Sequence, residues 1–421
     1  MAKTVVVVGA GVAGIQVAHQ LADLGMKVHL VEREATVGGL STHLGRVFPT
    51  DDCALCLDAC EELHSGKHRR CQYRSLLGTQ KGLTLHALTD VKSIKKNGGK
   101  FSVSLRTQPR FILPDRCVVC LECIKVCDVE VPDELNLGRS KRKAIYRPIP
   151  QGVPLIPVID IESCTKCGKC LDVCGVDAID LEQKQKNRTV NADAIVLATG
   201  VDERDPVVLP GYAYGECDDV LTQRELARLL DPAGPTNGTV LTAAEKPVGS
   251  VTMILCAGSR DLNAVEYCSQ ACCTYSIKHA VMLRNLGVDV TICYMDLRVP
   301  PHSQHYLDLA RDLGVKFVRG KPDHVKIREG SPVTIVEDTE STKRHEIESD
   351  LVVLASPLEP LASREEQFAS MLDQYGFISQ LGSKKGIYAC GTSTGPADIP
   401  TSVTEANSVA LQVYMDLEGG V

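Results

Sequence analysis

The sequence predicts an α/β fold in which two units with parallel sheets follow one another and a small α+β domain interrupts the first unit. Three observations predict it. Residues 4–8 are an apolar run suited to a buried parallel strand, and a glycine-rich turn, a helical pattern and a second strand at residues 28–31 follow. A matching strand pattern resumes at residues 190–200, after a cysteine-rich segment. A further strand–helix–strand pattern begins near Pro247.

The turn after the first strand carries three glycines, Gly9-x-Gly11-x-x-Gly14, and the second strand ends at Glu32. In this context the first glycine permits a tight turn, the second lets a pyrophosphate approach the backbone, and the third lets helix and strand pack closely. The helix N-terminus favours the pyrophosphate. Glu32 is placed to accept hydrogen bonds from ribose hydroxyls. Together these features predict dinucleotide binding by a Rossmann-type unit.

Composition narrows the function classes. A chain of 421 residues is long enough for two or three domains, and a net charge of −7 gives no general basic field for nucleic acid. Sixteen of the 19 cysteines fall into four local groups of four, a pattern typical of metal ligation in a reducing compartment. The chain opens directly on a strand and has no apolar run near the ~20 residues of a membrane span. We therefore expect a cytoplasmic protein that contacts a membrane only through partners.

Two of the cysteine groups have the spacing of bacterial ferredoxins, C-x-x-C-x-x-C-x-x-x-C. In two-cluster ferredoxins the fourth cysteine of each run binds the other cluster. We expect one 4Fe–4S cluster on Cys117, Cys120, Cys123 and Cys174, and a second on Cys164, Cys167, Cys170 and Cys127. The alternative is a pair of structural zinc sites, which would leave the third regularly spaced cysteine of each run unused.

The other two groups have no standard spacing. The first consists of Cys53, Cys56, Cys60 and Cys71, with His64 and His68 as alternative ligands. It either binds a cluster or zinc, or is a set of reduced thiols on a basic segment. The second, here called the third cysteine group, consists of Cys256, Cys268, Cys272 and Cys273. It follows a strand of the second α/β unit, where a pyridine-nucleotide fingerprint is absent, and it is either a cluster site or a set of small core residues.

Three further segments resemble motifs of the two-dinucleotide-binding-domain flavoproteins, the thioredoxin-reductase-like class. They are Glu32-Arg33 with Gly38-Gly39, the Ala-Thr-Gly turn ending at Gly200, and residues 386–391 with Asp398. The resemblance implies FAD rather than free NAD. The residues assigned to the cofactor are Gly9, Gly11, Gly14, Glu32, Arg33, Gly39, Val91, Thr199, Gly200 and Gly391.

These patterns divide the chain. We expect a FAD-binding domain made of residues 1–107, 189–246 and 361–421, an inserted ferredoxin-like domain at residues 108–188, and a second α/β domain at residues 247–360. The proline-rich linker at residues 147–157 supports the insertion. Since electrons tunnel only over short distances, an insertion in the flavin domain can hold a cluster near the flavin ring.

Nearly the whole chain resembles the A subunit of heterodisulfide reductase. The match rests on GAGVAG, on FPTDDCALC from Phe48, on the inserted double ferredoxin and on CAGSRD…YCSQACCTYSIKHA from Cys256. The resemblance implies a further 4Fe–4S cluster on the third cysteine group. The compact form looks more like the A subunit of the quinone-interacting membrane-bound oxidoreductase complex of sulfate reducers. That likeness implies a cytoplasmic protein held at the inner membrane by two partners, a second flavoprotein subunit with a quinone-reactive membrane subunit. In this role it relays electrons between the quinone-linked partner and adenylylsulfate reductase.

Three alternative functions remain at this point. The chain is a self-contained NAD(P)H oxidoreductase, a scaffold with zinc in its cysteine sites, or a subunit for flavin-based electron bifurcation. The missing glycine fingerprint in the second unit counts against the first. For an electron-transfer subunit no catalytic acid or base is expected, because the cofactors carry the chemistry.

Overall fold

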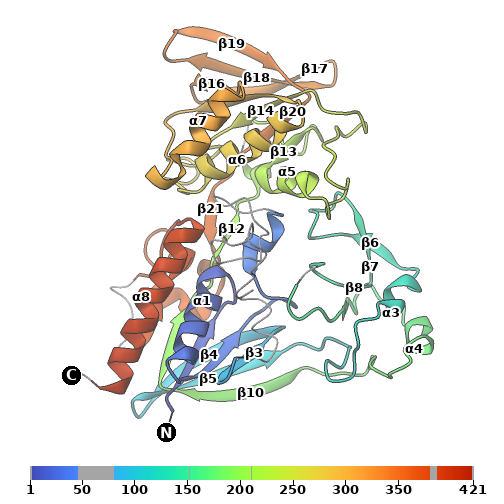
Figure 1. Ribbon diagram of the computed structural model, residues 1–421, viewed down its shortest axis with the longest axis vertical. Helices are drawn as coiled ribbons and strands as arrows, with labels where there is room; N and C mark the ends of the chain where they lie inside the picture. Colours follow the sequence, from blue (N-terminus) through green and yellow to red (C-terminus); the bar gives the residue numbers. More distant parts are fainter. Residues whose placement is uncertain (1, 46–79, 151, 210, 380–385, 420–421) are drawn as a thin grey trace, which may run out of the picture.

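The computed structural model describes residues 2–45, 80–150, 152–209, 211–379 and 386–419. The group of Cys53, Cys56, Cys60 and Cys71 lies outside the described residues. Two five-stranded parallel sheets form the main body. In Figure 1 the first sheet lies at the lower left, the second at the top, and the inserted domain at the right.

The first sheet has the order β22-β11-β1-β2-β3, so that strands from three separate stretches of the chain lie side by side. Its strands are β1 (Thr4–Val8), β2 (Lys27–Val31), β3 (Leu83–His86), β11 (Ala194–Leu197) and β22 (Ile387–Ala389). Val5 and Val7 pack in the cluster with α1 (Val12–Asp23) and α8 (Ile399–Glu418), whereas Val6 and Val8 pack on the opposite face. Because both faces are covered, β1 is a continuous apolar run rather than an alternating one.

The opposite face is covered by a three-stranded antiparallel sheet of β4 (Thr89–Asn97), β5 (Lys100–Thr107) and β10 (Lys186–Ala192). In the pairing of β5 with β10, Thr107 faces Lys186. The chain therefore leaves this sheet and rejoins it at the same point of one ladder, and the inserted domain occupies the interval.

The inserted domain is built from short elements around a small apolar cluster that includes Phe111, Ile145 and Ile159. Its elements are α3 (Glu122–Lys125), β6 (Glu130–Pro132), β7 (Lys141–Lys143), β8 (Ile145–Tyr146), β9 (Val158–Ile159) and α4 (Lys169–Asp172). The two helical turns, α3 and α4, pack against each other.

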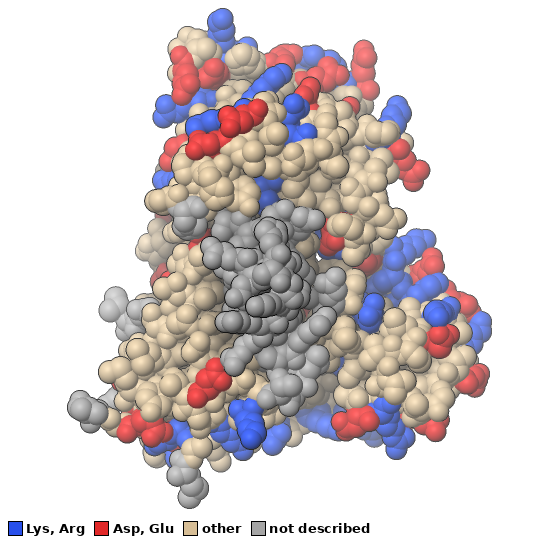
Figure 2. All heavy atoms as spheres, in the orientation of Figure 1, with Lys and Arg blue, Asp and Glu red and all other residues tan. Residues whose placement is uncertain are grey.

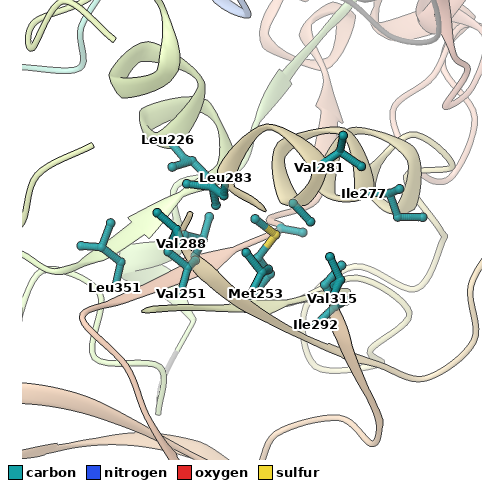
Figure 3. Close-up of a cluster of buried hydrophobic side chains, with 14 of the residues drawn as sticks. Leu226, Val251, Met253, Ile277, Val281, Leu283, Val288, Ile292, Val315 and Leu351 are labelled. Carbon is teal, nitrogen blue, oxygen red and sulfur yellow. The ribbon is translucent and has the colours of Figure 1, made fainter. Parts of the chain in front are cut away.

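The second sheet has the order β13-β20-β14-β15-β16. Its strands are β13 (Val220–Thr222), β14 (Ser250–Ile254), β15 (Asp289–Tyr294), β16 (Lys316–Arg319) and β20 (Leu351–Leu354). Figure 3 shows its core, where Met253 and Ile292 of the sheet lie below Ile277 and Leu283 of α6 (Cys272–Asn285). α5 (Gln223–Leu230) and α7 (Gln304–Asp312) complete this layer, and an antiparallel sheet of β17 (His324–Arg328), β18 (Ser331–Asp338) and β19 (Lys343–Glu348) lies beyond it.

The second unit begins earlier than the sequence predicts. A boundary near residue 246 would leave β13 and α5 with the first sheet, whereas β13 pairs in parallel with β20. The difference arises because a three-residue strand has no readable periodicity, and its partner lies far along the chain.

Two antiparallel strands, β12 (Val201–Glu203) and β21 (Leu358–Pro360), connect the two units. The described 3-10 helices are η1 (Gly39–His43), η3 (Pro206–Val208), η4 (Pro301–Ser303), η5 (Leu361–Arg364), η6 (Glu366–Met371) and η8 (Gly391–Ser393). None of the described helices combines the length and the apolar character that crossing a bilayer needs.

Candidate functional site

A cavity of about 230 Å³ opens at the carboxyl edge of the first sheet. Six of the residues predicted to bind the cofactor line it: Gly9, Gly11, Glu32, Gly39, Thr199 and Gly200. They come from the turns after β1, β2 and β11, which the parallel sheet brings to one edge. α8 and α6 supply the remaining walls.

The three fingerprint glycines each meet a different steric demand. Gly9 has φ +98°, and a Cβ there would lie 2.2 Å from the Ala198 carbonyl oxygen. A Cβ on Gly14 would lie 1.9 Å from the carbonyl oxygen of Gly9, so this glycine permits the close packing of α1 on the turn. At Gly11 the nearest atom, the Cα of Gly39, would be 4.0 Å away. Gly11 therefore leaves its space to the cavity.

Glu32 is buried at the end of β2. Its carboxylate accepts hydrogen bonds from the Ala10 N–H at 2.8 Å and the Glu34 N–H at 2.9 Å. Burial raises the pKa of this carboxyl, and the two backbone N–H groups oppose the rise. These contacts hold the acid at the wall of the cavity.

The other four predicted residues do not line the cavity. Gly14 lies within α1, and Gly391 (φ +68°) begins η8, where a Cβ would lie 2.5 Å from the Cβ of Ala13. Arg33 forms an ion pair with Glu365 at 3.1 Å. Val91 packs in the apolar cluster beneath the sheet, and its carbonyl accepts a hydrogen bond from Gln367 Nε2 at 2.9 Å. These residues support the walls of the cavity from behind.

The cavity has the donors that a phosphate-linked heterocycle requires. α1 begins at its wall and has no acidic residue in its first turn, and α8 begins there after Asp398. The buried Thr199 Oγ1 has no hydrogen-bond partner within the described part of the chain. Two positive helix ends and an unpaired hydroxyl fit FAD, which carries a pyrophosphate and a polar ring system.

The inserted domain has two small cavities of about 20 Å³ each. One is lined by Cys117, Cys120, Cys123 and Cys174. The other is lined by Cys127, Cys164, Cys167 and Cys170. The structure thus brings the cysteines together in the crossed sets expected from the spacing. Within the described residues, no three His, Cys, Asp or Glu side chains are gathered closely enough for a single metal ion; the thiols surround each cavity instead.

The two runs share a backbone device. Val119 (φ 57°) donates its N–H to Cys117 Sγ at 3.4 Å, and Lys166 (φ 54°) donates to Cys164 Sγ at the same distance. The left-handed residue turns an N–H toward sulfur in both loops. Burial and neighbouring thiols raise the pKa of Cys123 to about 11. Such crowded thiols favour a cationic cofactor that replaces their protons.

The third cysteine group lies at the carboxyl edge of the second sheet. Cys256 follows β14, while Cys272 and Cys273 are the first residues of α6; all three are buried, and Cys272 contacts the other two thiols. Cys268 is half-buried on the loop before α6. Hydrogen bonding to Cys272 and the nearby Arg260 lower the pKa of Cys256 to about 7. The alternative of small core residues does not account for three thiols in mutual contact.

α6 connects this group to the flavin cavity. Its first turn carries Cys272 and Cys273, and Thr274, Tyr275 and Lys278 of the same helix line the cavity. Burial first, and then the neighbouring Cys272, raise the pKa of Tyr275 well above its usual value. One turn of helix therefore separates the third cysteine group from the proposed flavin site.

Sequence reasoning missed the lining residues of α6. It assigned the segment to the second unit, and the contact with the first unit depends on how β12 and β21 join the two. The run Cys-Cys-Thr-Tyr-Ser-Ile-Lys that opens α6 was the signal at hand, because residues three and five positions after a ligand lie within about one turn of it.

Comparison with known proteins agrees with both cofactor regions. Residues 4–80 match the family of FAD dependent oxidoreductases, and residues 116–179 match the 4Fe-4S dicluster domain. The chain is 36% identical over 438 residues to the iron-sulfur A subunit of the CoB--CoM heterodisulfide reductase of Methanocaldococcus jannaschii, covering 99% of this chain and 65% of the relative. It is 35% identical to the A subunit of the ferredoxin:CoB-CoM heterodisulfide reductase of Methanosarcina mazei, covering 99% of this chain and 54% of that one. The chain thus spans less than two thirds of the length of these relatives.

Solved structures show the same fold. Thioredoxin reductase from T. acidophilum superposes with a TM-score of 0.55 at 15% identity, covering 99% of this chain and 100% of that one. Thioredoxin reductase from Lactococcus lactis gives 0.50 at 15% identity, with 98% of each chain covered. The predicted fold class, a thioredoxin-reductase-like flavoprotein with an inserted dicluster domain, is confirmed.

Proposed function

We propose that this chain, which is homologous over nearly its whole length to the A subunits of heterodisulfide reductases, is an electron-transfer subunit of a larger oxidoreductase complex. In this proposal FAD occupies the cavity of the first unit, two 4Fe–4S clusters occupy the crossed cysteine sets of the inserted domain, and a third occupies the third cysteine group. The observation that carries the proposal is α6, whose first turn holds two cysteines and whose next residues line the flavin cavity.

When bound, FAD exchanges electrons in pairs and each cluster exchanges one, so the pair can be divided between the two kinds of carrier. The chain's own residues supply position and environment. The fingerprint glycines let the backbone approach the pyrophosphate, and Glu32 receives the ribose. The thiols and the N–H groups aimed at them hold the clusters, and burial excludes water from them. No described residue needs to act as a general acid or base.

We further infer that the partners are a second flavoprotein subunit together with a quinone-reactive membrane subunit. The chain would lie on the cytoplasmic side of the inner membrane and relay electrons between that quinone-linked partner and adenylylsulfate reductase. Its similarity to the compact form found in quinone-interacting complexes supports this choice. The name of the Methanosarcina mazei relative couples ferredoxin with the CoB–CoM heterodisulfide, and this supports a second candidate, in which one flavin serves two acceptors. Simultaneous reduction of a high- and a low-potential acceptor by the purified complex would favour the second candidate.

The first test is anaerobic purification with its co-purifying subunits, followed by iron and flavin analysis. We expect one FAD and about twelve iron atoms per chain, from three clusters of four. NADH alone should leave the flavin oxidised, because the third cysteine group stands where the second unit would bind nicotinamide. Iron-free protein would refute the proposal, and bleaching of the flavin by NADH would favour a self-contained NAD(P)H oxidoreductase.

A further inference from the structure

Three charged side chains form a continuous bridge beside the third cysteine group. Arg260 Nη1 donates to Asp296 Oδ1, and Arg298 Nε donates to Asp296 Oδ2 at 3.2 Å. Arg260 lies on the loop after β14, and the other two lie on the loop after β15. Two guanidinium groups share one carboxylate, so the bridge carries a net positive charge.

Both arginines contact the cysteines. The guanidinium of Arg260 donates a hydrogen bond to the sulfur of Cys256. The backbone N–H of Arg298 donates to Cys273 Sγ at 3.4 Å, and its side chain lies near Cys268. The bridge therefore reaches three of the four cysteines, from two loops at the same edge of the sheet.

The lysines beside the cysteines of the inserted domain differ from this arrangement. Lys125 pairs with Glu122 at 2.7 Å, Lys143 pairs with Glu130 at 2.9 Å, and Lys169 pairs with Asp128. Each of these positive charges is matched by one carboxylate. In Figure 2, positive and negative side chains are interspersed over this domain. The lysines therefore provide a matched control for the arginine bridge.

We propose that Arg260 and Arg298 are positioning residues that raise the reduction potential of the cluster held by the third cysteine group. The inference rests on the proposed function, which places a cluster there. Reduction adds one negative charge to a cluster, and both a nearby positive charge and hydrogen bonds to its sulfurs favour the reduced form. The side chains of Arg260 and Arg298 are 27% and 49% exposed, so solvent screens part of the effect, most strongly for Arg298.

The test is a redox titration monitored by EPR on the anaerobically purified chain with its clusters. For Arg260→Gln we expect the reduction equilibrium of one cluster to fall about tenfold, which corresponds to about 59 mV for one electron. Arg260→Lys keeps the charge and should recover part of the shift. Asp296→Asn removes the negative member of the bridge and should move the same midpoint upward. Lys169→Gln, in the inserted domain, should leave it unchanged.

Each outcome decides the proposal. An unchanged midpoint in Arg260→Gln with full iron content overturns it and leaves the proposed function intact. Shifts of the same sign in Arg260→Gln and Asp296→Asn also overturn it, because charge would then not be the cause. If Arg260→Gln loses the iron of this site, the direction of the Asp296→Asn shift decides. Wild-type protein with only about eight iron atoms overturns both the inference and the third cluster of the proposed function.

Discussion

The two α/β units use the same strand–turn–helix connection for different purposes. In the first unit, residues 9–11 alone separate β1 from α1, and two of them are glycines. In the second unit, residues 255–271 separate β14 from α6, and they include Cys256 and Cys268. The short turn brings backbone to the edge of the sheet, whereas the long one brings thiols to it.

The comparison shows that one sheet edge can serve two kinds of ligand. In open parallel sheets, ligands bind outside the carboxyl ends of the strands, whatever the loops are made of. Gly258 of the second unit (φ +83°) illustrates the change, because a Cβ there would lie 2.6 Å from the side chain of Leu209. That glycine permits local packing instead of opening space for a phosphate. The fold thus determines where a site lies, and the loop determines what it binds.

Gly11→Val should have the largest effect, and it should be confined to the first unit. Its side chain would fill the space beside Gly39 that the pyrophosphate needs, so we expect FAD affinity to fall at least about a hundredfold, or about 3 kcal/mol. Flavin per chain would be measured by absorbance, and iron per chain should stay near the wild-type value. Gly249→Ala, in the second unit, is the control and should retain its flavin. Normal yellow colour in Gly11→Val would contradict the assignment.

Cys272→Ala should have the converse effect. Its thiol contacts both Cys256 and Cys273, and we expect the loss of about four of about twelve iron atoms with FAD retained. Cys293→Ala is the matched control, because Cys293 is equally buried on β15 but lies outside the group. Iron and flavin would be quantified in both variants. Equal iron in the two variants would show that the third cysteine group binds no cluster.

The smallest predicted effect concerns Glu203 of β12, between the two units. Burial raises the pKa of this carboxyl to about 8 from its ordinary 4.5, and Arg224 opposes the rise. Since the folded pKa exceeds the unfolded one, its contribution to stability is full below pH 4.5 and is lost as the pH rises through 8. Partial solvent exposure limits the loss to about 1 kcal/mol, or about 2–4 °C in Tm.

The measurement for Glu203 is thermal unfolding at pH 5 and pH 8.5. Glu203→Gln should reduce the difference in Tm between the two pH values. If the difference is the same in the variant as in wild type, Glu203 is not its source.

Much of this architecture could be predicted from local sequence. The strand–glycine–helix pattern around Gly9 and the regular cysteine runs are short-range signals, and the structure places both as the patterns indicate. Two features depend on distant contacts instead. β13 joins the second sheet through its pairing with β20, and α6 reaches the flavin cavity because β12 and β21 hold the units together. No local pattern encodes such contacts.

The predicted cofactor residues Arg33 and Val91 illustrate the same limit. Motif spacing places them near the flavin, but it does not tell a wall of the cavity from its support. In the structure Arg33 pairs with Glu365, far along the chain, and Val91 packs with the core. Their assignment as cofactor-binding residues stays a prediction.

The ladder between β5 and β10 has a consequence for how the protein is assembled. Because Thr107 and Lys186 face each other, the flavin-binding framework meets the inserted domain at two adjacent strand ends. A short hairpin at that point would join the same strands in the same register. Assembly of the flavin framework therefore does not have to wait for iron, and a cell short of metal can stockpile the unfinished chain and load its clusters later.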